Sequence, residues 1–304
     1  MTFPIIPFAE GEARLNWLDL AEALARGHDL PRAEIGDTFL YRDPDTLLSR
    51  AAWIDGLGSL VKTATVFPGN PDRGAPMVNG AVNLFSDRDG TLAALVDFHL
   101  VTKWKTACDS LLAALRLADP ASRSILIVGA GTVGGSLIEA FGAGFPEARF
   151  TLWNRTRAKA ETLAADYDNV AVAGDLEEAV RAADIVVSAT MSSEPVIRGD
   201  WLRPGQHVNL IGAYRPDMRE ADDTAMARSR IFVDSRATTI GHIGELMIPI
   251  AAGVISADDI VADFYDLPAF GHDAGSISLF KNGGGAHLDL MTARYILDMW
   301  LQDG

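Results

Sequence analysis

Ser124-Ile-Leu-Ile-Val-Gly-Ala-Gly-Thr-Val-Gly-Gly135 is an apolar run that leads directly into glycines at Gly129, Gly131 and Gly134, and a helical pattern follows. Glycines at this spacing between a strand and a helix are typical of a dinucleotide-binding turn, where backbone N–H groups at the helix start hold the pyrophosphate. A turn that needed glycine only for tight packing would not require all three. The stretch therefore predicts a nucleotide-binding domain.

The end of the next apolar strand, Phe150-Thr-Leu-Trp153, predicts which nucleotide is bound. Such sites usually carry an acidic residue there for the ribose hydroxyl, but this chain has Asn154-Arg155-Thr156. An arginine beside an amide and a hydroxyl can hydrogen-bond a 2′-phosphate, so the sequence favours NADPH over NADH. The alternative is a polar strand exit with a solvated arginine.

Apolar strand patterns alternate with helical patterns from residue 125 to about residue 235. Short strands with few polar interruptions, separated by helices, indicate a parallel sheet covered on both faces. The fold class is therefore α/β, with a doubly wound domain. Its expected strands are Ile125–Val128, Phe150–Trp153, Val170–Ala173, Ile185–Ser188, His207–Ile211 and Ile231–Asp234.

The first hundred residues have a different pattern, which predicts an antiparallel sheet. An amphipathic helix over about Arg14–Arg26 precedes a strand-like run, Leu60–Phe67. Gly80–Phe85 and Thr91–Val96 then flank Ser86-Asp-Arg-Asp-Gly90, whose Asp and Gly suit a hairpin turn.

Two further helices are expected to join the domains. One, over about Val101–Leu117, leads into the nucleotide domain, and the other, Leu288–Leu301, is strongly amphipathic. Because the doubly wound pattern ends before residue 288, the last helix is expected to return to the first domain. The predicted domains are residues 1–116 with 287–304, and residues 117–286.

The composition limits the classes of partner. The chain has 304 residues, of which 48% are hydrophobic, so it can bury a large core. Its formal net charge of −15 disfavours binding to nucleic acid or to an anionic membrane. Cys108 is the only cysteine, no apolar run is long enough to span a bilayer, and the first residues make a poor secretory signal. We therefore expect a cytoplasmic protein without disulfides.

A few residues could carry chemistry. Lys62 lies in a strand with two apolar faces, so it either extends its charge to solvent or has a partner, and burial would lower its pKa. Lys103 and Lys105 on their own are consistent with surface charges. The six histidines do not have metal-ligand spacing, so no metal site is predicted.

An ordered set of short blocks gives a family resemblance. In this order and over nearly the whole chain, they resemble the ornithine cyclodeaminase/μ-crystallin family. The blocks are Val61-Lys62, Phe67-Pro-Gly-Asn70, Thr102-Lys-Trp-Lys-Thr-Ala107, Val128-Gly-Ala-Gly131, Trp153-Asn-Arg-Thr156, Gly212-Ala-Tyr-Arg-Pro-Asp-Met-Arg-Glu220 and Leu279-Phe-Lys281.

The resemblance implies an NAD(P)-dependent homodimer, with a Rossmann domain between the two ends of an α+β substrate and dimerisation domain. Family members act on imines or amines next to a carboxylate. Lys62 matches the lysine that contacts substrate and assists proton transfer, and Arg32 matches an arginine that holds the substrate carboxylate. Lys105 stands where many members have an arginine, so a cation is kept but the bidentate fork is lost.

Tyr214 stands where the ornithine-cyclising members have an aspartate. Tyrosine is a poor general base at neutral pH, so ornithine cyclisation is disfavoured. The block that contains Tyr214, Gly212–Glu220, more closely resembles that of members that reduce cyclic ketimines such as Δ1-pyrroline-2-carboxylate. The expected reaction is reduction of that ring, or of the six-membered Δ1-piperideine-2-carboxylate, to L-proline or L-pipecolate.

Alternative functions are an amino-acid dehydrogenase that releases ammonia, as with alanine, an ornithine cyclodeaminase, and a non-catalytic NADPH-dependent protein that binds a small hydrophobic ligand. The predicted substrate-binding residues are Arg32, Lys62 and Lys105. The predicted cofactor-binding residues are Thr106, Gly129, Gly131, Thr132, Val133, Gly134, Asn154, Arg155, Thr156, Ala189, Thr190, Met191, Tyr214 and Lys281.

Overall fold

A computed structural model describes residues 3–302, which divide into two compact units. The first unit contains the residues up to Thr106 and those from Gly285 onward, and the second contains Ala107–Gly284. The division falls inside helix α3 (Phe98–Leu117), whereas the sequence-based ranges placed it after residue 116. Because α3 is one continuous helix, its periodicity contains no sign of the boundary.

The first unit is built on a six-stranded sheet with the order β1-β6-β5-β4-β3-β2. Strands β2 to β6 form an antiparallel meander, and the short β1 pairs with β6 in parallel. The strands are β1 (Ile5–Ile6), β2 (Glu34–Arg42), β3 (Asp45–Ile54), β4 (Gly58–Val66), β5 (Val78–Phe85) and β6 (Leu92–Asp97).

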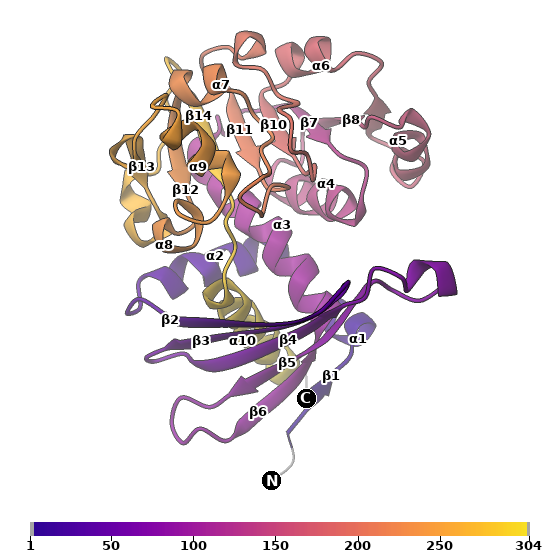
Figure 1. The fold of residues 1–304 in the computed structure, drawn as a ribbon, viewed down its shortest axis with the longest axis vertical. Coiled ribbons are helices and arrows are strands. Elements are labelled where there is room, and N and C mark those ends of the chain that lie inside the picture. Colours follow the sequence, from indigo (N-terminus) through magenta and orange to yellow (C-terminus); the bar gives the residue numbers. More distant parts are fainter. Residues whose placement is uncertain (1–2, 303–304) are drawn as a thin grey trace. The chain divides into compact units, whose positions relative to one another are not determined.

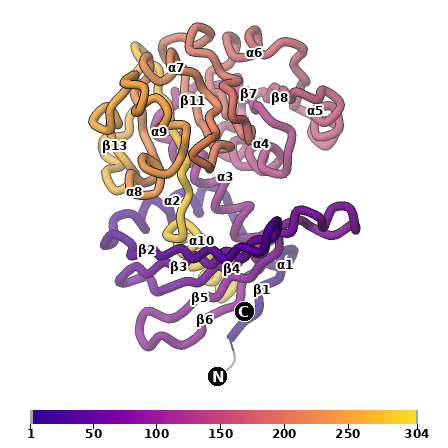
Figure 2. The backbone as a smooth tube through the Cα atoms, in the orientation of Figure 1, coloured from indigo at the N-terminus to yellow at the C-terminus, as the bar shows by residue number. Residues whose placement is uncertain are grey.

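The predicted hairpin is confirmed as β5 and β6. Gly90 has a positive φ of 67°, which suits glycine, and the Asp89 carboxylate accepts hydrogen bonds from the Thr91 backbone and hydroxyl. The longer connection between β4 and β5 contains the 3-10 helix η1 (Pro71–Arg73) and protrudes beyond the sheet (Figure 2).

The helices of the first unit pack on this sheet. Helix α10 (Ala286–Gln302) contacts β3, β4 and α2 (Trp17–His28), and Figure 1 shows it along the sheet. The short α1 (Phe8–Glu12) lies near the start of the chain. The expected start of α2 at Arg14 is wrong, because the Asn16 side chain accepts from the amides of Leu18 and Asp19 and so caps the helix at Trp17.

The second unit is built on an eight-stranded parallel sheet with the order β13-β12-β14-β11-β10-β7-β8-β9 (Figure 1). The six predicted strands are present, and two more, β13 and β14, were not predicted. Strand β14 lies between β11 and β12. The strands are β7 (Ser124–Val128), β8 (Arg149–Trp153), β9 (Val170–Val172), β10 (Ile185–Ser188), β11 (His207–Leu210), β12 (Ser229–Val233), β13 (Ile260–Ala262) and β14 (Ile277–Lys281).

Helices and short turns connect these strands. All four residues of β10 and of β11 are buried, as expected for strands covered on both faces. The connecting elements are α4 (Thr132–Gly144), α5 (Arg157–Ala164), α6 (Leu176–Ala182), η2 (Gly199–Trp201), α7 (Asp223–Arg228), α8 (Arg236–Thr239), α9 (Gly244–Ala251), η3 (Ala257–Asp259) and η4 (Phe264–Ala269).

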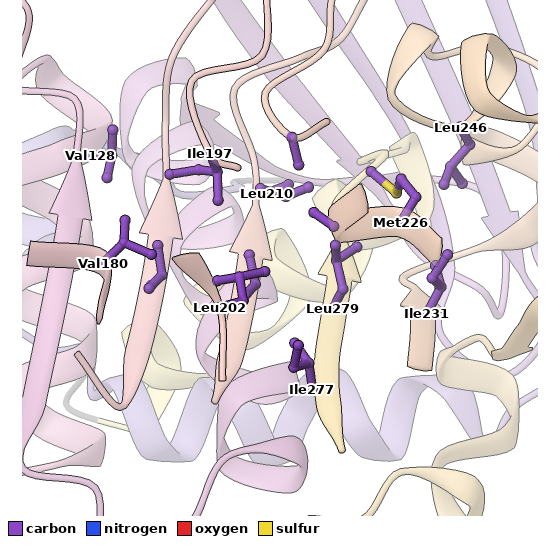
Figure 3. Packing of buried hydrophobic residues seen from close by; sticks show 14 of the residues in the cluster. Val128, Val180, Ile197, Leu202, Leu210, Met226, Ile231, Leu246, Ile277 and Leu279 are labelled. Carbon is purple, nitrogen blue, oxygen red and sulfur yellow. The ribbon is translucent and has the colours of Figure 1, made fainter. Parts of the chain in front are cut away.

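One apolar cluster holds helices onto this sheet. Figure 3 shows side chains from the strands, such as Val128 and Leu210, beside Val180 of α6, Met226 of α7 and Leu246 of α9. Burial of these side chains fixes the carboxyl ends of β7, β10 and β11, the edge at which ligands bind in open α/β sheets. Within residues 3–302, no helix is long and apolar enough to cross a membrane.

Candidate functional site

The glycine turn between β7 and α4 has the geometry of a phosphate-binding turn. Gly129 has a φ of 119°, and a Cβ there would lie 2.8 Å from the Ala189 carbonyl oxygen. Gly131 caps α4, and a Cβ on it would meet no described atom within 4 Å. The backbone at Gly131 is therefore open to a ligand at the N-terminus of a 13-residue helix, which attracts anions.

A cavity of about 390 Å³ opens at this turn. It is formed by the segments that follow β7, β8 and β10, at the point where the order of the parallel strands reverses. Most of the predicted cofactor-binding residues line it. These are Gly129, Gly131, Asn154, Arg155, Thr156, Ala189, Thr190 and Met191.

Asn154 joins the glycine turn to the segment expected to bind the ribose. Its Oδ1 accepts a hydrogen bond from the Ala130 amide at 3.2 Å, and its Nδ2 donates to the Thr156 carbonyl at 2.9 Å. The exposed Arg155 is thereby held at the cavity wall. Lys159, in the first turn of α5, also lines the cavity and was not predicted, although the sequence places this second cation only four residues after Arg155.

The other predicted cofactor-binding residues do not line this cavity. Thr132 lines an adjoining hollow whose walls come from α4 and α5, and Val133 is half-buried in the same helix turn. Gly134 is buried, and a Cβ on it would collide with the Gly129 carbonyl oxygen, so it permits close packing of helix and turn. Thr106 is half-buried on α3, and Tyr214 is 59% exposed. For these residues, as for those that line the cavity, a cofactor contact stays a prediction.

Glu220 is a buried carboxylate that ties together the two segments following β10 and β11. Its Oε1 accepts from the Ser188 hydroxyl at 2.6 Å and from the Thr190 amide and hydroxyl at 2.7 and 2.9 Å. Its Oε2 accepts from the amides of Gly212 and Ala213 at 2.6 and 3.2 Å. One side chain thus positions the backbone of Thr190 at the cavity.

Lys281 is fully buried beneath this arrangement, and its ammonium donates to the Leu210 carbonyl at 3.0 Å. Burial lowers the pKa of Lys281, while Glu220 and Glu245 raise it. Burial raises the pKa of Glu245 to about 7 against the opposing effect of Lys281. These contacts give Lys281 a structural place at the end of β14, and direct contact with a cofactor stays a prediction.

In the first unit, Lys62 lies on the buried face of β4, in line with Leu60 and Ala64. Its ammonium donates to Asp289 Oδ1 and to the Thr102 hydroxyl, both at 2.9 Å. It also lies 4.8 Å from the centre of the Phe98 ring. The sequence left two interpretations of Lys62, a charge that extends to solvent or a charge with a partner. The structure shows the second, and the partner is Asp289 on α10.

The electrostatic surroundings of this ion pair are unusual. Burial lowers the pKa of Lys62, and Asp289 only partly offsets that effect. Burial alone would raise the pKa of Asp289, but Lys62 and Lys105 reverse the direction and lower it. A lysine whose pKa is lowered in this way can give up a proton closer to neutral pH than an exposed lysine does.

Lys105 belongs to the same electrostatic group, because its charge acts on both Lys62 and Asp289. Arg32 lies in the exposed segment before β2, and its role in holding a carboxylate stays a prediction. His287 is buried next to this group at a ring distance of 5.6 Å from His28. Burial lowers the pKa of His287 to about 3, so its ring is neutral at physiological pH.

The fold and the two sites define a class: a two-unit dinucleotide-binding protein with a buried lysine and carboxylate on a separate sheet. Residues 55–304 match the model of the ornithine cyclodeaminase/mu-crystallin family. The chain belongs to that family, as the resemblance of its motifs predicted.

Relatives with known names are similar over most of the chain. A Δ1-pyrroline-2-carboxylate reductase of Paracoccus denitrificans is 52% identical over 300 residues, which cover 96% of this chain and 95% of that protein. A ketimine reductase mu-crystallin of Rattus norvegicus is 34% identical over 242 residues, or 79% of this chain and 75% of that protein.

Solved structures have the same fold. The Δ1-pyrroline-2-carboxylate reductase of Thermococcus litoralis, in complex with NADH and L-proline, superposes with a TM-score of 0.90 at 24% identity, covering 99% of this chain and 98% of that one. An archaeal alanine dehydrogenase dimer with bound NAD has a TM-score of 0.89 at 25% identity, covering 100% and 97% of the two chains.

Proposed function

We propose that this protein is an NAD(P)H-dependent ketimine reductase that converts Δ1-pyrroline-2-carboxylate to L-proline. The six-membered Δ1-piperideine-2-carboxylate is a second substrate, reduced to L-pipecolate. The observation that carries the proposal is the buried Lys62, paired with Asp289 among further cations, in a chain whose relative of 52% identity is a Δ1-pyrroline-2-carboxylate reductase.

The residues of the second unit fit a dinucleotide. The open backbone at Gly131 and the start of α4 would hold the pyrophosphate. The cavity wall formed by Ala189 and Thr190 would contact the part of the cofactor next to the pyrophosphate. When bound, the reduced cofactor supplies the hydride that adds to C2 of the cyclic imine.

Lys62 has the role of the acid. Its ammonium gives a proton to the imine nitrogen, so that C2 becomes electrophilic and the electron pair of the C=N bond ends on nitrogen. The ammonium donates one hydrogen bond to Asp289 and one to Thr102, and these two bonds fix its position. Arg32 and Lys105 hold the carboxylate of the substrate by charge-assisted hydrogen bonds.

The experiment that tests the proposal is a steady-state assay of the purified protein with both cyclic imines, following the loss of absorbance of the reduced cofactor. We expect turnover with the five-membered ring, and no ammonia-dependent oxidation of NADPH with pyruvate, which would mark an alanine-type dehydrogenase. Tight NADPH binding without turnover of either ring would instead support the non-catalytic binding protein. Release of ammonia from ornithine would support a cyclodeaminase, which Tyr214 disfavours.

We infer that NADPH is the preferred cofactor, because Arg155, Thr156 and Lys159 at the cavity provide donors and positive charge in place of a ribose-binding acid. Arg155→Leu is expected to lower kcat/KM for NADPH by about 10- to 100-fold, the value of a charge-assisted hydrogen bond, with little change for NADH. Arg157→Leu, which breaks an exposed contact with Glu161, serves as control. Equal use of NADH and NADPH by the wild type would contradict this inference.

We propose that the active form is a homodimer in the cytoplasm. All nine residues of the edge strand β2 are exposed, and Leu40 and Tyr41 are 60% and 76% exposed. An exposed edge strand that carries large apolar side chains promotes association, which a second copy of the chain would satisfy. Light scattering should give a mass near twice 32.6 kDa, and a monomer mass at micromolar concentration would exclude this arrangement.

A further inference from the structure

Arg50 lies on the same face of the sheet as Lys62. The two residues are directly opposite each other in the antiparallel pair β3 and β4. Side chains in this relation project from the same face, with Cβ atoms about 4.5–5.5 Å apart. Asp37 of β2 is in turn directly opposite Arg50, so three neighbouring strands form one row of charged residues, Asp37, Arg50 and Lys62.

The Arg50 guanidinium is held in place without being buried. Its Nε and Nη2 donate to Asp37 Oδ2 at 3.0 and 2.9 Å. The Arg50 side chain is 29% exposed, compared with 9% for Lys62. Arg50 is therefore oriented by a carboxylate on the neighbouring strand while part of its side chain still meets solvent, as a ligand-binding group requires.

The charges in this group do not cancel. Lys62, Lys105 and Arg50 are three cations, whereas Asp289 and Asp37 are two carboxylates. Cations therefore outnumber carboxylates among these five side chains when all are ionised. Their field attracts anions, and the carboxylate of a small substrate is such an anion.

The arginine also supplies a geometry that Lys105 lacks. A lysine ammonium is a point charge, whereas a guanidinium presents parallel N–H donors that match a carboxylate. Arg50 is directly opposite Lys62, so it offers a carboxylate next to Lys62 the planar recognition that Lys105 does not.

We propose that Arg50 is a carboxylate-binding residue that determines specificity for imines with a 2-carboxylate. This proposal rests on the proposed function, and it adds Arg50 to the residues predicted from the sequence. Asp37 acts as a positioning residue, because it orients the guanidinium and contacts the substrate only through Arg50.

The test compares two imines, Δ1-pyrroline-2-carboxylate and Δ1-pyrroline, which lacks the carboxylate. Arg50→Gln is expected to raise KM for the acid by about 10- to 100-fold, with kcat and the KM for NADPH within about threefold of the wild type. The preference for the acid over Δ1-pyrroline, as a ratio of kcat/KM values, should fall by at least about tenfold. Arg50→Lys should recover part of this loss.

Two further variants separate binding from folding. Asp37→Asn keeps the Arg50 charge but weakens its orientation, and it should raise KM for the acid by a smaller factor than Arg50→Gln does. Arg42→Gln, which removes an exposed arginine paired with Asp45 on the same hairpin, should leave both KM values unchanged.

The outcomes distinguish this proposal from the proposed function. If the wild type does not reduce the acid, the function itself is wrong. If the wild type reduces it and Arg50→Gln has the same KM, or loses activity equally with both imines, then Arg50 has no role in binding the carboxylate.

Discussion

Lys62→Met is expected to lower turnover of the cyclic imine by about a hundredfold or more, the usual contribution of a positioned acid. Methionine keeps an unbranched apolar stem in the strand but removes the ammonium that contacts Asp289 and Thr102. The Kd for NADPH, measured by titration, should change little, because the nucleotide cavity is lined by residues of the second unit.

The loss of the ammonium also leaves Asp289 buried without its cation, which costs about 3–5 kcal/mol of unfolding free energy. A double variant, Lys62→Met with Asp289→Asn, removes that charge and should recover stability without recovering turnover. Lys103→Met, which removes the ion pair with Glu12 on the same unit, is the matched control. Full activity in the folded double variant would disprove a catalytic role for Lys62.

The pH dependence has a definite sign. Because burial lowers the pKa of Lys62, its acid form is lost at a lower pH than for an exposed lysine. Reduction needs the ammonium, so kcat/KM should fall as the pH rises through this lowered pKa. Oxidation of L-proline needs the neutral amine of Lys62 as the base, so kcat/KM for that direction should rise over the same pH range. If the residual activity of Lys62→Met falls over the same pH range, then the titration of another group causes the fall.

Some of these features follow from local patterns in the sequence, and others depend on contacts between distant residues. The glycine turn at Gly129–Gly134 was predictable because its spacing, its preceding strand and its following helix are contiguous. Lys62 stood out because an alternating strand placed a charge on an apolar face. Its partner Asp289 is 227 residues away, and within an amphipathic helix it has no local sign of pairing.

The hairpin of β2 and β3 was missed for a related reason. Every residue of β2 is exposed, so hydrophobic and polar residues do not alternate along it, and its β-branched and aromatic residues are the one strand signal that it carries. Arg50 can be placed opposite Lys62 only when the register of β3 and β4 is known. Glu220 was quoted in a sequence block, but its role depends on two loops that close around it.

Glu220→Gln is expected to lower both the stability of the protein and its affinity for NADPH. The carboxylate accepts five hydrogen bonds, and an amide at the same place would present its NH2 group to donors on one side. The unfolding free energy should fall by about 3 kcal/mol or more, since buried donors lose a charged partner. For a domain of this size the melting temperature falls by roughly 2–4 °C per kcal/mol.

The affinity should fall because Glu220 fixes the approach of the two loops. A Cβ on Gly212 would collide with the Thr190 backbone, so the segments that follow β10 and β11 touch directly where Glu220 joins them. If the Thr190 segment moves away from the cavity, a loss of about 1.4 kcal/mol raises the Kd for NADPH tenfold. Titration calorimetry with NADPH, at a temperature where the variant is folded, measures this loss.

A graded series separates positioning from general destabilisation. Ser188→Ala removes one of the five hydrogen bonds and should cost about 1–2 kcal/mol of stability with a smaller change in Kd. Glu194→Gln, an exposed glutamate in the same loop, should change neither quantity. If Glu220→Gln melts at a lower temperature yet binds NADPH with the wild-type Kd, the carboxylate stabilises the fold without positioning the cofactor site. If neither quantity changes, the two loops are held by their own backbone packing.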